Sequence, residues 1–503
     1  MTGKAIMIQG TGSDVGKSVL TAALCRIFVR KGYRVAPFKA QNMALNSFVT
    51  LEGGEIGRAQ AVQAAAARAE PSFHMNPVLL KPREDTSAQV IVHGFPVGNL
   101  EAGEYIAYKK KLIPRVRESL DYLKENYDLV VIEGAGSPAE VNLREHDLVN
   151  MATAFEANSP VLLAADIDRG GVFATLVGTF ALLEEKERNM IKGIIINKFR
   201  GQLERLKPGL EELEGLVKTP VTGVVPYYTH LRIPEEDTYL PREEKKKGEK
   251  DLEILVVNLP HISNFTDFDP LEEIEGVYLR YAVNPEEMGN PQALIIPGSK
   301  NTIEDLAYLW DKGWAEKIIA FAREGGLVAG ICGGYQMLGR EIVDVQGTES
   351  RIHRIKGLGL LNIKTEFYPE KVTCQAGGKV VATGDLVEGY EIHMGRTRLL
   401  EGVEPFLKLT WRGRESIEEF DGAIREDGQI FGTYLHGLFD QVSFRVKFIN
   451  KLRALKGLSP LKEEGQLSQF QVWEKSFEGL ADLVEESLDM DYISGLLSLE
   501  LSG

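Results

Sequence analysis

Short apolar runs rich in β-branched residues alternate with stretches of helical periodicity along most of this 503-residue chain. In the first half these runs are Ala5–Gln9, Arg34–Phe38, Leu129–Glu133, Val161–Asp166, Gly193–Asn197 and Val221–Val225. The helical stretches between them include Lys17–Arg30, Gly57–Ala69 and Glu104–Asn126. Strands that are apolar along their whole length are typical of a parallel sheet with helices on both faces. The first half is therefore predicted to be a doubly wound α/β domain.

The same alternation restarts after an interruption in the middle of the chain. Residues 231–250 end in "PREEKKKGEK", a run of mixed charge without an apolar face, which predicts a solvated linker. Beyond it, the runs Leu252–Asn258, Ala293–Ile296 and Leu327–Ile331 predict a second, mostly parallel sheet. A chain of this length is also too long for a single core. We predict domains at residues 1–230 and 251–442, followed by a helical C-terminal extension at residues 443–503.

Composition limits the partners and the compartment. A formal net charge of -15 argues against nucleic acid or an anionic membrane as a partner, because either favours a basic face. Cys25, Cys332 and Cys374 lack the paired spacing of a zinc site or a disulfide framework, which fits a reducing compartment. No apolar run is long enough for a signal peptide or a bilayer span. We expect a cytoplasmic protein of undetermined oligomeric state.

The stretch "QGTGSDVGKSV" lies between the first predicted strand and the first predicted helix. It looks like a phosphate-binding loop with one extra residue, since five residues rather than four separate Gly10 from Gly16. Glycines allow backbone N–H groups to point at an anion, and the helix N-terminus adds partial positive charge. The alternative is a glycine turn without a ligand. The loop predicts nucleotide binding by Gly10, Thr11, Gly12, Ser13, Asp14, Val15, Gly16, Lys17 and Ser18.

Acidic residues at neighbouring strand ends complete a predicted magnesium site. In a phosphate loop the hydroxyl of Ser18 ligates Mg²⁺, and a second ligand comes from the carboxyl edge of the sheet. Glu133 follows one apolar run in "VVIEGAG", and Asp166 follows another in "LLAADIDRGG". Both are predicted metal ligands, although an acidic residue after a strand can instead cap the next helix.

Polar residues follow two further strands of the first half. Lys39, Gln41 and Asn42 stand just beyond the second strand, where they could neutralise and orient a polar or anionic substrate. A solvated lysine at a strand end is the alternative. Asn197 ends a later strand, and its amide is predicted to contact the edge of a nucleotide base.

The second half contains a predicted nucleophile. In "GLVAGICGGYQMLG", Cys332 lies between an apolar strand and a helix, with small neighbours that permit a strained, exposed turn. The N–H of Gly333 is then a natural oxyanion donor, and Gly298–Ser299 after an upstream strand could supply a second. A thiol nucleophile needs a base, which His436 in "IFGTYLHGLFD" offers.

These motifs resemble two known enzyme families. The loop "GTGSDVGKS" and the segment "EGAG" resemble dethiobiotin synthetase, which activates a carboxylate or carbamate with ATP. The cysteine turn resembles the class I glutamine amidotransferases, whose Cys-His pair releases ammonia from glutamine. Many of that class have an acidic residue two positions after the histidine, where this chain has Leu438, so Asp440 and Glu391 remain alternative partners of the imidazole. His393 is predicted either to line the glutamine pocket or to be a satisfied strand-end histidine.

Taken together, the halves resemble the cobyrinate amidases of the vitamin B12 pathway over nearly the whole chain. The segments that carry this resemblance include "PFKAQNMALNS", "ADIDRGGVFA", "PGSKNTIEDL" and "GYEIHMGRT". The resemblance implies amidation of adenosylcobyrinic acid a,c-diamide at its b, d, e and g carboxylates, with ATP, Mg²⁺ and glutamine. Three alternatives stay open: amidation of the a and c carboxylates, a partitioning-type P-loop ATPase switch, and a glutaminase with a regulatory N-terminal domain.

Overall fold

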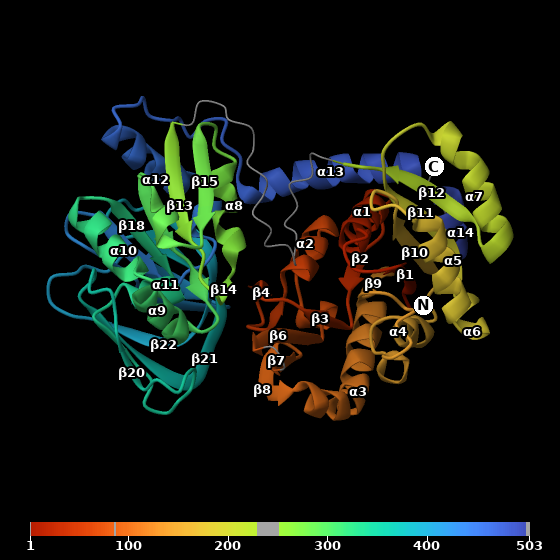
Figure 1. Cartoon of the computed structure of the whole chain (residues 1–503), viewed down its shortest axis with the longest axis horizontal. Helices are drawn as coiled ribbons and strands as arrows, with labels where there is room; N and C mark the ends of the chain where they lie inside the picture. The colour runs from red at the N-terminus through yellow and green to blue at the C-terminus, as the bar shows by residue number, and fades with distance from the viewer. Residues whose placement is uncertain (1, 85–86, 229–250, 499–503) are drawn as a thin grey trace. The chain divides into compact units, whose positions relative to one another are not determined.

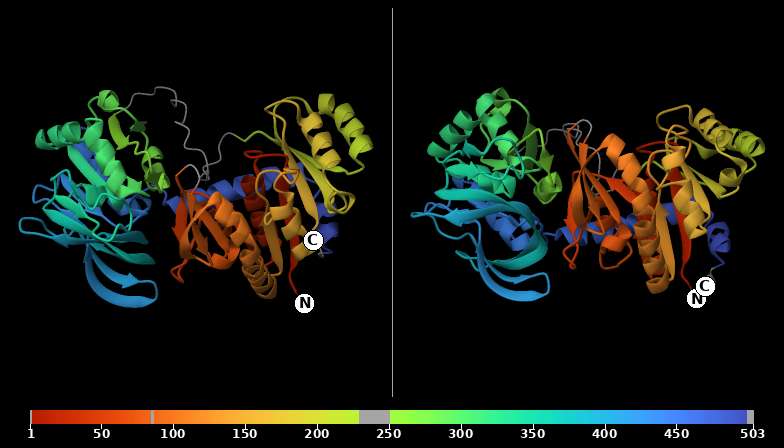
Figure 2. Two further views of the ribbon diagram at one scale, coloured as in Figure 1. Left: turned by 60° about the horizontal axis from the view of Figure 1, so that its bottom comes forward. Right: turned by 90° about the horizontal axis from the view of Figure 1, so that it is seen from below.

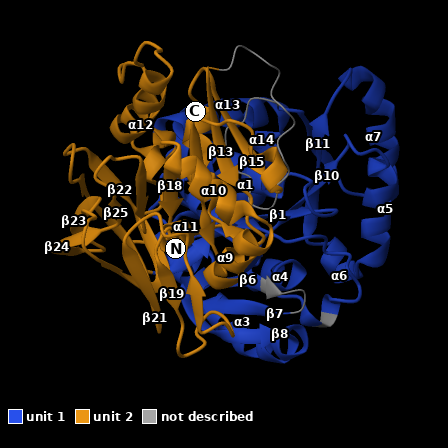
Figure 3. Cartoon of the chain, turned by 60° about the vertical axis from the view of Figure 1, so that its left-hand side comes forward, with its two compact units in different colours: residues 1–44, 54–236, 471–503 blue, residues 45–53, 237–470 orange. Residues whose placement is uncertain are grey.

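A computed structural model describes residues 2–84, 87–228 and 251–498 (Figure 1). The predicted linker at residues 231–250 lies outside the described residues. The described residues fall into two compact units, one within residues 1–44, 54–236 and 471–503 and the other within residues 45–53 and 237–470 (Figure 3). The predicted boundaries at residues 230, 251 and 442 therefore miss two segments: residues 45–53 belong to the second unit, and residues 471–503 belong to the first. No helix among the described residues is long and apolar enough to cross a membrane.

The first unit is built on a parallel sheet with the strand order β12-β11-β10-β1-β9-β2, in which every pair of neighbours is parallel. Its strands are β1 (Lys4–Gly10), β2 (Val35–Phe38), β9 (Leu129–Glu133), β10 (Val161–Asp166), β11 (Ile191–Phe199) and β12 (Val221–Pro226). Every residue of β9 and β10 is buried, which explains why both sequences are apolar up to the acidic residue that ends each strand, Glu133 and Asp166. The predicted doubly wound α/β fold is confirmed for this unit.

Helices cover both faces of this sheet (Figure 2). Along β1, Met7 joins a core cluster with residues of α3 (Ala102–Asn126), α4 (Met151–Ala157), α5 (Val172–Leu182) and α7 (Leu203–Val217). Ile6 and Ile8 point to the other face, into a cluster with α1 (Lys17–Arg30), α13 (Gln469–Ser487) and α14 (Met490–Leu497). This alternation follows from the two-residue period of a strand. The remaining helices are α2 (Arg58–Ala66) and α6 (Glu185–Arg188).

The C-terminal helices divide between the two units. Phe444 and Leu452 of α12 (Val442–Leu455) join the core of the second unit. Phe477 of α13 and Ile493 of α14 instead pack in the first unit, where buried Arg26 of α1 pairs with Glu474 and Glu478. The predicted extension at residues 443–503 is thus not one element, because its apolar faces match different cores.

A smaller sheet in the first unit was not predicted. Its strand order is β3-β6-β7-β8, with β3 (Gln41–Met43), β6 (Val78–Glu84), β7 (Ser87–Val92) and β8 (Phe95–Glu101). Between β3 and β6 the chain also forms β5 (Glu55–Gly57) and the 3-10 turn η1 (Phe73–Met75), as well as β4 (Ser47–Val49), which belongs to the second unit. Gln41 and Asn42 belong to its first strand, β3, which begins two residues after Lys39.

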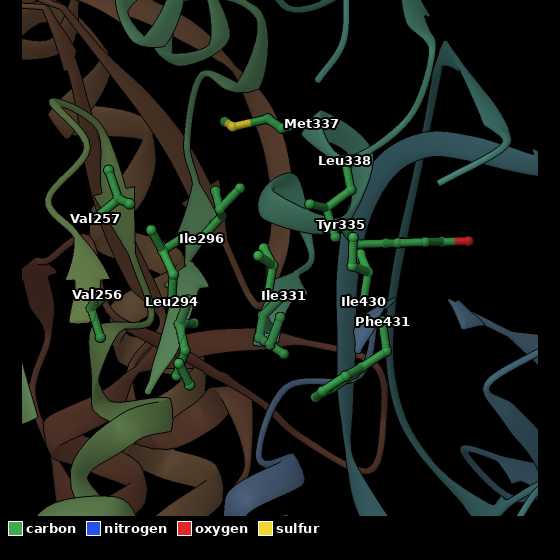
Figure 4. Packing of buried hydrophobic residues seen from close by; sticks show 14 of the residues in the cluster. Val256, Val257, Leu294, Ile296, Ile331, Tyr335, Met337, Leu338, Ile430 and Phe431 are labelled. Carbon is green, nitrogen blue, oxygen red and sulfur yellow. The ribbon is translucent and has the colours of Figure 1, made fainter. Parts of the chain in front are cut away.

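The second unit also has a mostly parallel sheet, with the order β15-β13-β16-β18-β26-β25 and an antiparallel pair only at the β25 edge. The strands are β13 (Leu252–Val257), β15 (Val277–Ala282), β16 (Ala293–Ile296), β18 (Leu327–Ile331), β25 (Ala423–Ile424) and β26 (Ile430–Thr433). Side chains of β13, β16, β18 and β26 form the core beside α11 (Gly333–Met337), as Figure 4 shows. The predicted second α/β domain is confirmed.

Further elements surround this sheet. The helices are α8 (Asp269–Glu272), α9 (Thr302–Asp311) and α10 (Trp314–Arg323), with the 3-10 turns η3 (Phe265–Phe268), η4 (Pro285–Met288) and η5 (Leu438–Asp440). Short strands β14 (Ile262–Ser263) and β17 (Gly298–Ser299) pair with each other. A mixed sheet contains β19 (Glu341–Val343), β20 (Arg354–Lys356), β21 (Ile363–Val380), β22 (Leu386–Leu399), β23 (Leu407–Arg412) and β24 (Glu415–Asp421). Its long β21–β22 hairpin carries His393.

Candidate active sites

Cys332 occupies a strained turn between β18 and α11. Its backbone has φ 52° and ψ -108°, a conformation that residues other than glycine rarely adopt. The turn is tight enough that a Cβ on Gly334 would stand 2.0 Å from the carbonyl oxygen of Ile296, and one on Gly330 2.7 Å from Gly334. The pattern Gly-x-Cys-Gly-Gly is therefore required by close backbone packing, and the turn has the shape of a nucleophile elbow.

His436 lies beside Cys332 and is held by a carboxylate. Its ring is fully buried, and Nδ1 is 2.6 Å from Oδ2 of Asp267 in η3. Burial disfavours the imidazolium, but the charge of Asp267 and the hydrogen-bonded Cys332 sulfur outweigh it and raise the pKa of His436 to about 10. The ring is thus fixed with Nδ1 toward Asp267 and favoured in its protonated form. This is the arrangement of a Cys-His-Asp triad.

Asp267 is the acidic partner that the sequence analysis could not identify. Neither of the alternatives occupies this place. Glu391 instead accepts a 2.7 Å hydrogen bond from Nε of Arg412, and Asp440 lies in the turn that follows Gly437, whose N–H Asp267 also accepts at 3.3 Å. The available signal was "NFTDFDP", in which Asp267 is flanked within two positions by Phe265 and Phe268. Asp267 and Phe268 are buried, and a buried carboxylate is unusual unless it has a partner.

The predicted oxyanion residues come together next to this triad. A Cβ on Gly333 would stand 3.0 Å from the backbone nitrogen of Ser299, and one on Gly298 would stand 3.2 Å from Cε1 of His436. Ser299 itself is held by a hydrogen bond from its hydroxyl to Asp305. The backbones of Gly333 and Ser299 therefore lie close together next to the residues of the triad.

His393 lies in a neighbouring layer of side chains. Its ring stacks on Tyr434 with centroids 3.7 Å apart, and its Nδ1 is 2.8 Å from the carbonyl oxygen of Gly395. The hydroxyl of Tyr434 accepts a hydrogen bond from Gln336, which stands four residues after Cys332 on α11. The structure therefore places His393 with Tyr434 and Gln336, and gives it no described hydrogen bond to Cys332 or His436.

In the first unit, the extra residue of the phosphate loop is accommodated by two left-handed residues. Asp14 has φ 59° and Gly16 has φ 94°. A Cβ on Gly16 would stand 2.2 Å from Nδ2 of Asn197, so only glycine fits there. The Asn197 amide donates to the carbonyl oxygen of Val15 at 2.8 Å, so in this structure it supports the loop. Lys17 at the start of α1 donates to the carbonyl oxygen of Gly12 at 2.7 Å.

Glu133 is the centre of a buried polar cluster beside this loop. Its Oε1 accepts 2.9 Å hydrogen bonds from the hydroxyl of Ser18 and the ammonium group of Lys39, and its Oε2 accepts one from Gln63 of α2. Burial alone would raise the pKa of Glu133, but Lys39, Gln63 and Ser18 together hold it below its ordinary value. Glu133 is therefore a carboxylate positioned next to the loop serine.

Three of the predicted ligand and substrate residues have other contacts. Oδ2 of Asp166 pairs with Lys198 at 3.0 Å, and among the described hydrogen bonds and ion pairs none joins Asp166 to Ser18 or Glu133. Gln41 accepts from the hydroxyl of Tyr105, and Asn42 donates to Gln60 at 2.9 Å.

The donor set at Ser18 and Glu133 fits Mg²⁺. A hydroxyl and a carboxylate oxygen stand 2.9 Å apart next to a phosphate loop, and this ion takes few protein oxygens alongside phosphate oxygens and water. Lys39 already supplies positive charge at the same carboxylate oxygen. The described residues contain no cluster of three or more His, Cys, Asp or Glu side chains of the kind that cages a metal with protein groups alone.

Comparison with known proteins identifies both halves. The model of the CobQ/CobB/MinD/ParA nucleotide binding domain matches residues 6–240, and that of the CobB/CobQ-like glutamine amidotransferase domain matches residues 253–444. A cobyric acid synthase of Thermoanaerobacter sp. (strain X514) is 51% identical over 496 residues, which cover 96% of this chain and 97% of that protein. One of Alkaliphilus metalliredigens (strain QYMF) is 52% identical over 504 residues, covering 98% of this chain and 100% of that protein.

Proposed function

Because this chain belongs to the cobyric acid synthase family, we propose that it amidates the b, d, e and g carboxylates of adenosylcobyrinic acid a,c-diamide to give adenosylcobyric acid. It is a ligase that uses ATP and glutamine to amidate a corrinoid in cobalamin biosynthesis. We assign ATP chemistry to the domain at residues 1–230 and glutamine hydrolysis to the domain at residues 251–442.

In the proposed glutaminase reaction, the Cys332 thiolate attacks the side-chain amide carbon of glutamine. The N–H groups of Gly333 and Ser299 stabilise the negative charge that develops on the carbonyl oxygen. The His436 imidazolium donates its Nε2 proton to the departing nitrogen, which leaves as ammonia, while Asp267 keeps the ring oriented. Water then hydrolyses the glutamyl thioester and releases glutamate.

In the proposed synthetase reaction, a corrinoid carboxylate attacks the γ-phosphorus of ATP to form an acyl phosphate and ADP. Lys17 and the N–H groups of the loop hold the phosphates and stabilise the charge of the transferring group. Ser18 and Glu133 would hold Mg²⁺, which supplies additional positive charge when bound. Ammonia then displaces phosphate from the acyl carbon, giving the amide.

The observation that carries this proposal is the Cys332–His436–Asp267 arrangement on the same chain as the Ser18–Glu133–Lys39 cluster. A partitioning-type ATPase switch has no use for the first of these sites. A glutaminase with a merely regulatory N-terminal domain has no use for a serine, a carboxylate and a lysine joined beside a phosphate loop. An a,c-diamide synthase would use both sites, so only the substrate separates it from the proposed function.

Mass spectrometry of the amidated product tests the proposal directly. With ATP, Mg²⁺ and glutamine, the full chain is expected to add four amides to adenosylcobyrinic acid a,c-diamide. Two amides added to cobyrinic acid, with none added to the diamide, would identify an a,c-diamide synthase instead. A Cys332→Ala variant is expected to lose the glutamine-dependent reaction and to keep amidation from free ammonia; loss of both would contradict the division of labour between the sites.

A further inference from the structure

Residues 45–53, here called the strap, belong to the glutaminase unit although they lie within the first predicted domain (Figure 3). The chain on both sides of the strap belongs to the other unit. Four residues of the strap are buried: Asn46 and Ser47 are 1% exposed, and Val49 and Thr50 are 0% exposed.

The strap reaches one edge of the catalytic imidazole through Asn264. The backbone N–H of Ser47 donates to Oδ1 of Asn264 at 3.3 Å, and Nδ2 of Asn264 is 3.4 Å from Nε2 of His436. Because a backbone N–H can only donate, the end of the Asn264 amide that faces the ring is its NH₂ group, which donates to Nε2 when the imidazole is neutral, that is, after His436 has given up its Nε2 proton. Asn264 is buried and left-handed, with φ 53°, so its placement depends on its surroundings.

The strap also supports one face of the same ring. Tyr390 of β22 stacks on His436 with centroids 5.0 Å apart and an interplanar angle of 13°. The hydroxyl of Tyr390 donates to the carbonyl oxygen of Ser47 at 3.4 Å, and its ring lies 5.9 Å from that of Phe48. Besides Asp267 and Cys332, the imidazole therefore contacts Asn264 and Tyr390, and the strap supports both of them.

A third set of contacts leads to the nucleophile. Val49 packs with Tyr390 and Ile392 in a small buried cluster, and its carbonyl oxygen accepts a 3.0 Å hydrogen bond from Gln375. The carbonyl oxygen of Ile392 lies 3.5 Å from the sulfur of Cys332. One short segment therefore contacts the neighbours of both the base and the thiol.

We propose that the strap is a positioning segment of the glutaminase site, which holds His436 in the geometry needed for proton transfer to and from Cys332 and the leaving ammonia. This rests on the proposed glutaminase function. Proton transfer and nucleophilic attack depend steeply on placement, since a shift of about 1 Å can cost about 100-fold in rate. Loss of the strap's contacts is therefore expected to lower kcat while leaving the glutamine-binding contacts, and so KM, nearly unchanged.

Two substitutions at one position test this in the full chain. Ser47→Pro removes the N–H that Asn264 accepts, whereas Ser47→Ala keeps it and serves as the matched control. Ser47→Pro is expected to lower the kcat of glutamine hydrolysis about tenfold or more, with KM changed less than about twofold. Amidation from free ammonia is expected to stay within about twofold of wild type, and Ser47→Ala to keep a higher kcat than Ser47→Pro. In an Asn264→Ala background, Ser47→Pro should add almost no further loss, because the two residues act through one contact.

Val49→Ala and Val49→Ile provide a second comparison in case Ser47→Pro fails to fold, which a thermal melt detects. Val49→Ala is expected to lower kcat, whereas Val49→Ile is expected to keep kcat near the wild-type value. The proposal is overturned if the folded strap variants keep wild-type kcat, if they raise KM alone, or if they lose ammonia-dependent amidation equally. Failure of the proposed function would look different, because wild-type protein would then show no glutamine hydrolysis.

Discussion

Asp267→Asn tests the least expected residue of the site. The carboxylate and the imidazole form a 2.6 Å contact between side chains that are 6% and 0% exposed, so solvent screens their interaction little. At an effective dielectric constant of about 20, two unit charges about 4 Å apart interact by about 4 kcal/mol. Divided by 1.36 kcal/mol for each pH unit, this corresponds to a change of about 3 in pKa. Neutralising Asp267 should therefore lower the pKa of His436 from about 10 to about 7.

The sign of the expected effect follows from the role of the proton. In the wild type the imidazolium persists up to about pH 10 and can protonate the leaving ammonia. In Asp267→Asn it is lost as the pH rises through about 7, so roughly a tenth of it remains at pH 8. An asparagine amide at Nδ1 also favours the wrong tautomer of the neutral ring. Together these effects are expected to reduce kcat/KM for glutamine about 100-fold to 10,000-fold, most strongly at alkaline pH.

The assay is glutamate release as a function of pH from 6 to 9, with ammonia-dependent amidation as the check on the other site. Asp440→Asn is the matched control, since Asp440 is the acidic residue that stands nearer to His436 in sequence. We expect its kcat/KM to stay within about twofold of wild type. The reasoning is refuted if Asp267→Asn keeps a wild-type rate and pH profile, or if Asp440→Asn is the variant that loses them.

Three further predictions concern other parts of the molecule. Lys39→Met removes a cation 2.9 Å from the buried carboxylate of Glu133. It is expected to lower ATP-dependent amidation about 100-fold or more, whether glutamine or free ammonia supplies the nitrogen. If glutaminase activity fell in parallel, the role of Lys39 would not be confined to the synthetase site. Gly334→Ala puts a Cβ 2.0 Å from the carbonyl oxygen of Ile296 and should abolish glutamine hydrolysis, because it displaces the turn that carries Cys332. If Cys332 were alkylated normally and the variant still hydrolysed glutamine at the wild-type rate, the turn would tolerate a side chain. Phe477→Ala removes a side chain that is 1% exposed and packs between α13 and the first unit's sheet. It should lower the free energy of unfolding, measured in urea, by about 3–5 kcal/mol. A loss below about 1 kcal/mol would show that α13 is not part of that core.

The sequence by itself determined the parallel sheets, the loop with its Lys17 and Ser18, and the elbow at Cys332. Each depends on neighbours in the chain: strands buried on both faces must be apolar throughout, and tight turns next to them need glycine at set positions. Lys17–Arg30 was predicted with the bounds that α1 has, because strand, loop and helix signals are all local.

Only the tertiary structure decided which carboxylate orients His436, where Asp166 and Asn197 make their contacts, and which unit holds residues 45–53 and 471–503. Asp267 stands 169 positions before His436, and Ser47 meets Asn264 across 217 positions. Such pairs are selected by burial, because a carboxylate or an amide inside a core must find a partner wherever the folded chain provides one. Which partner it finds depends on how whole helices and strands pack together, and the local spacing of residues in the sequence does not specify that packing.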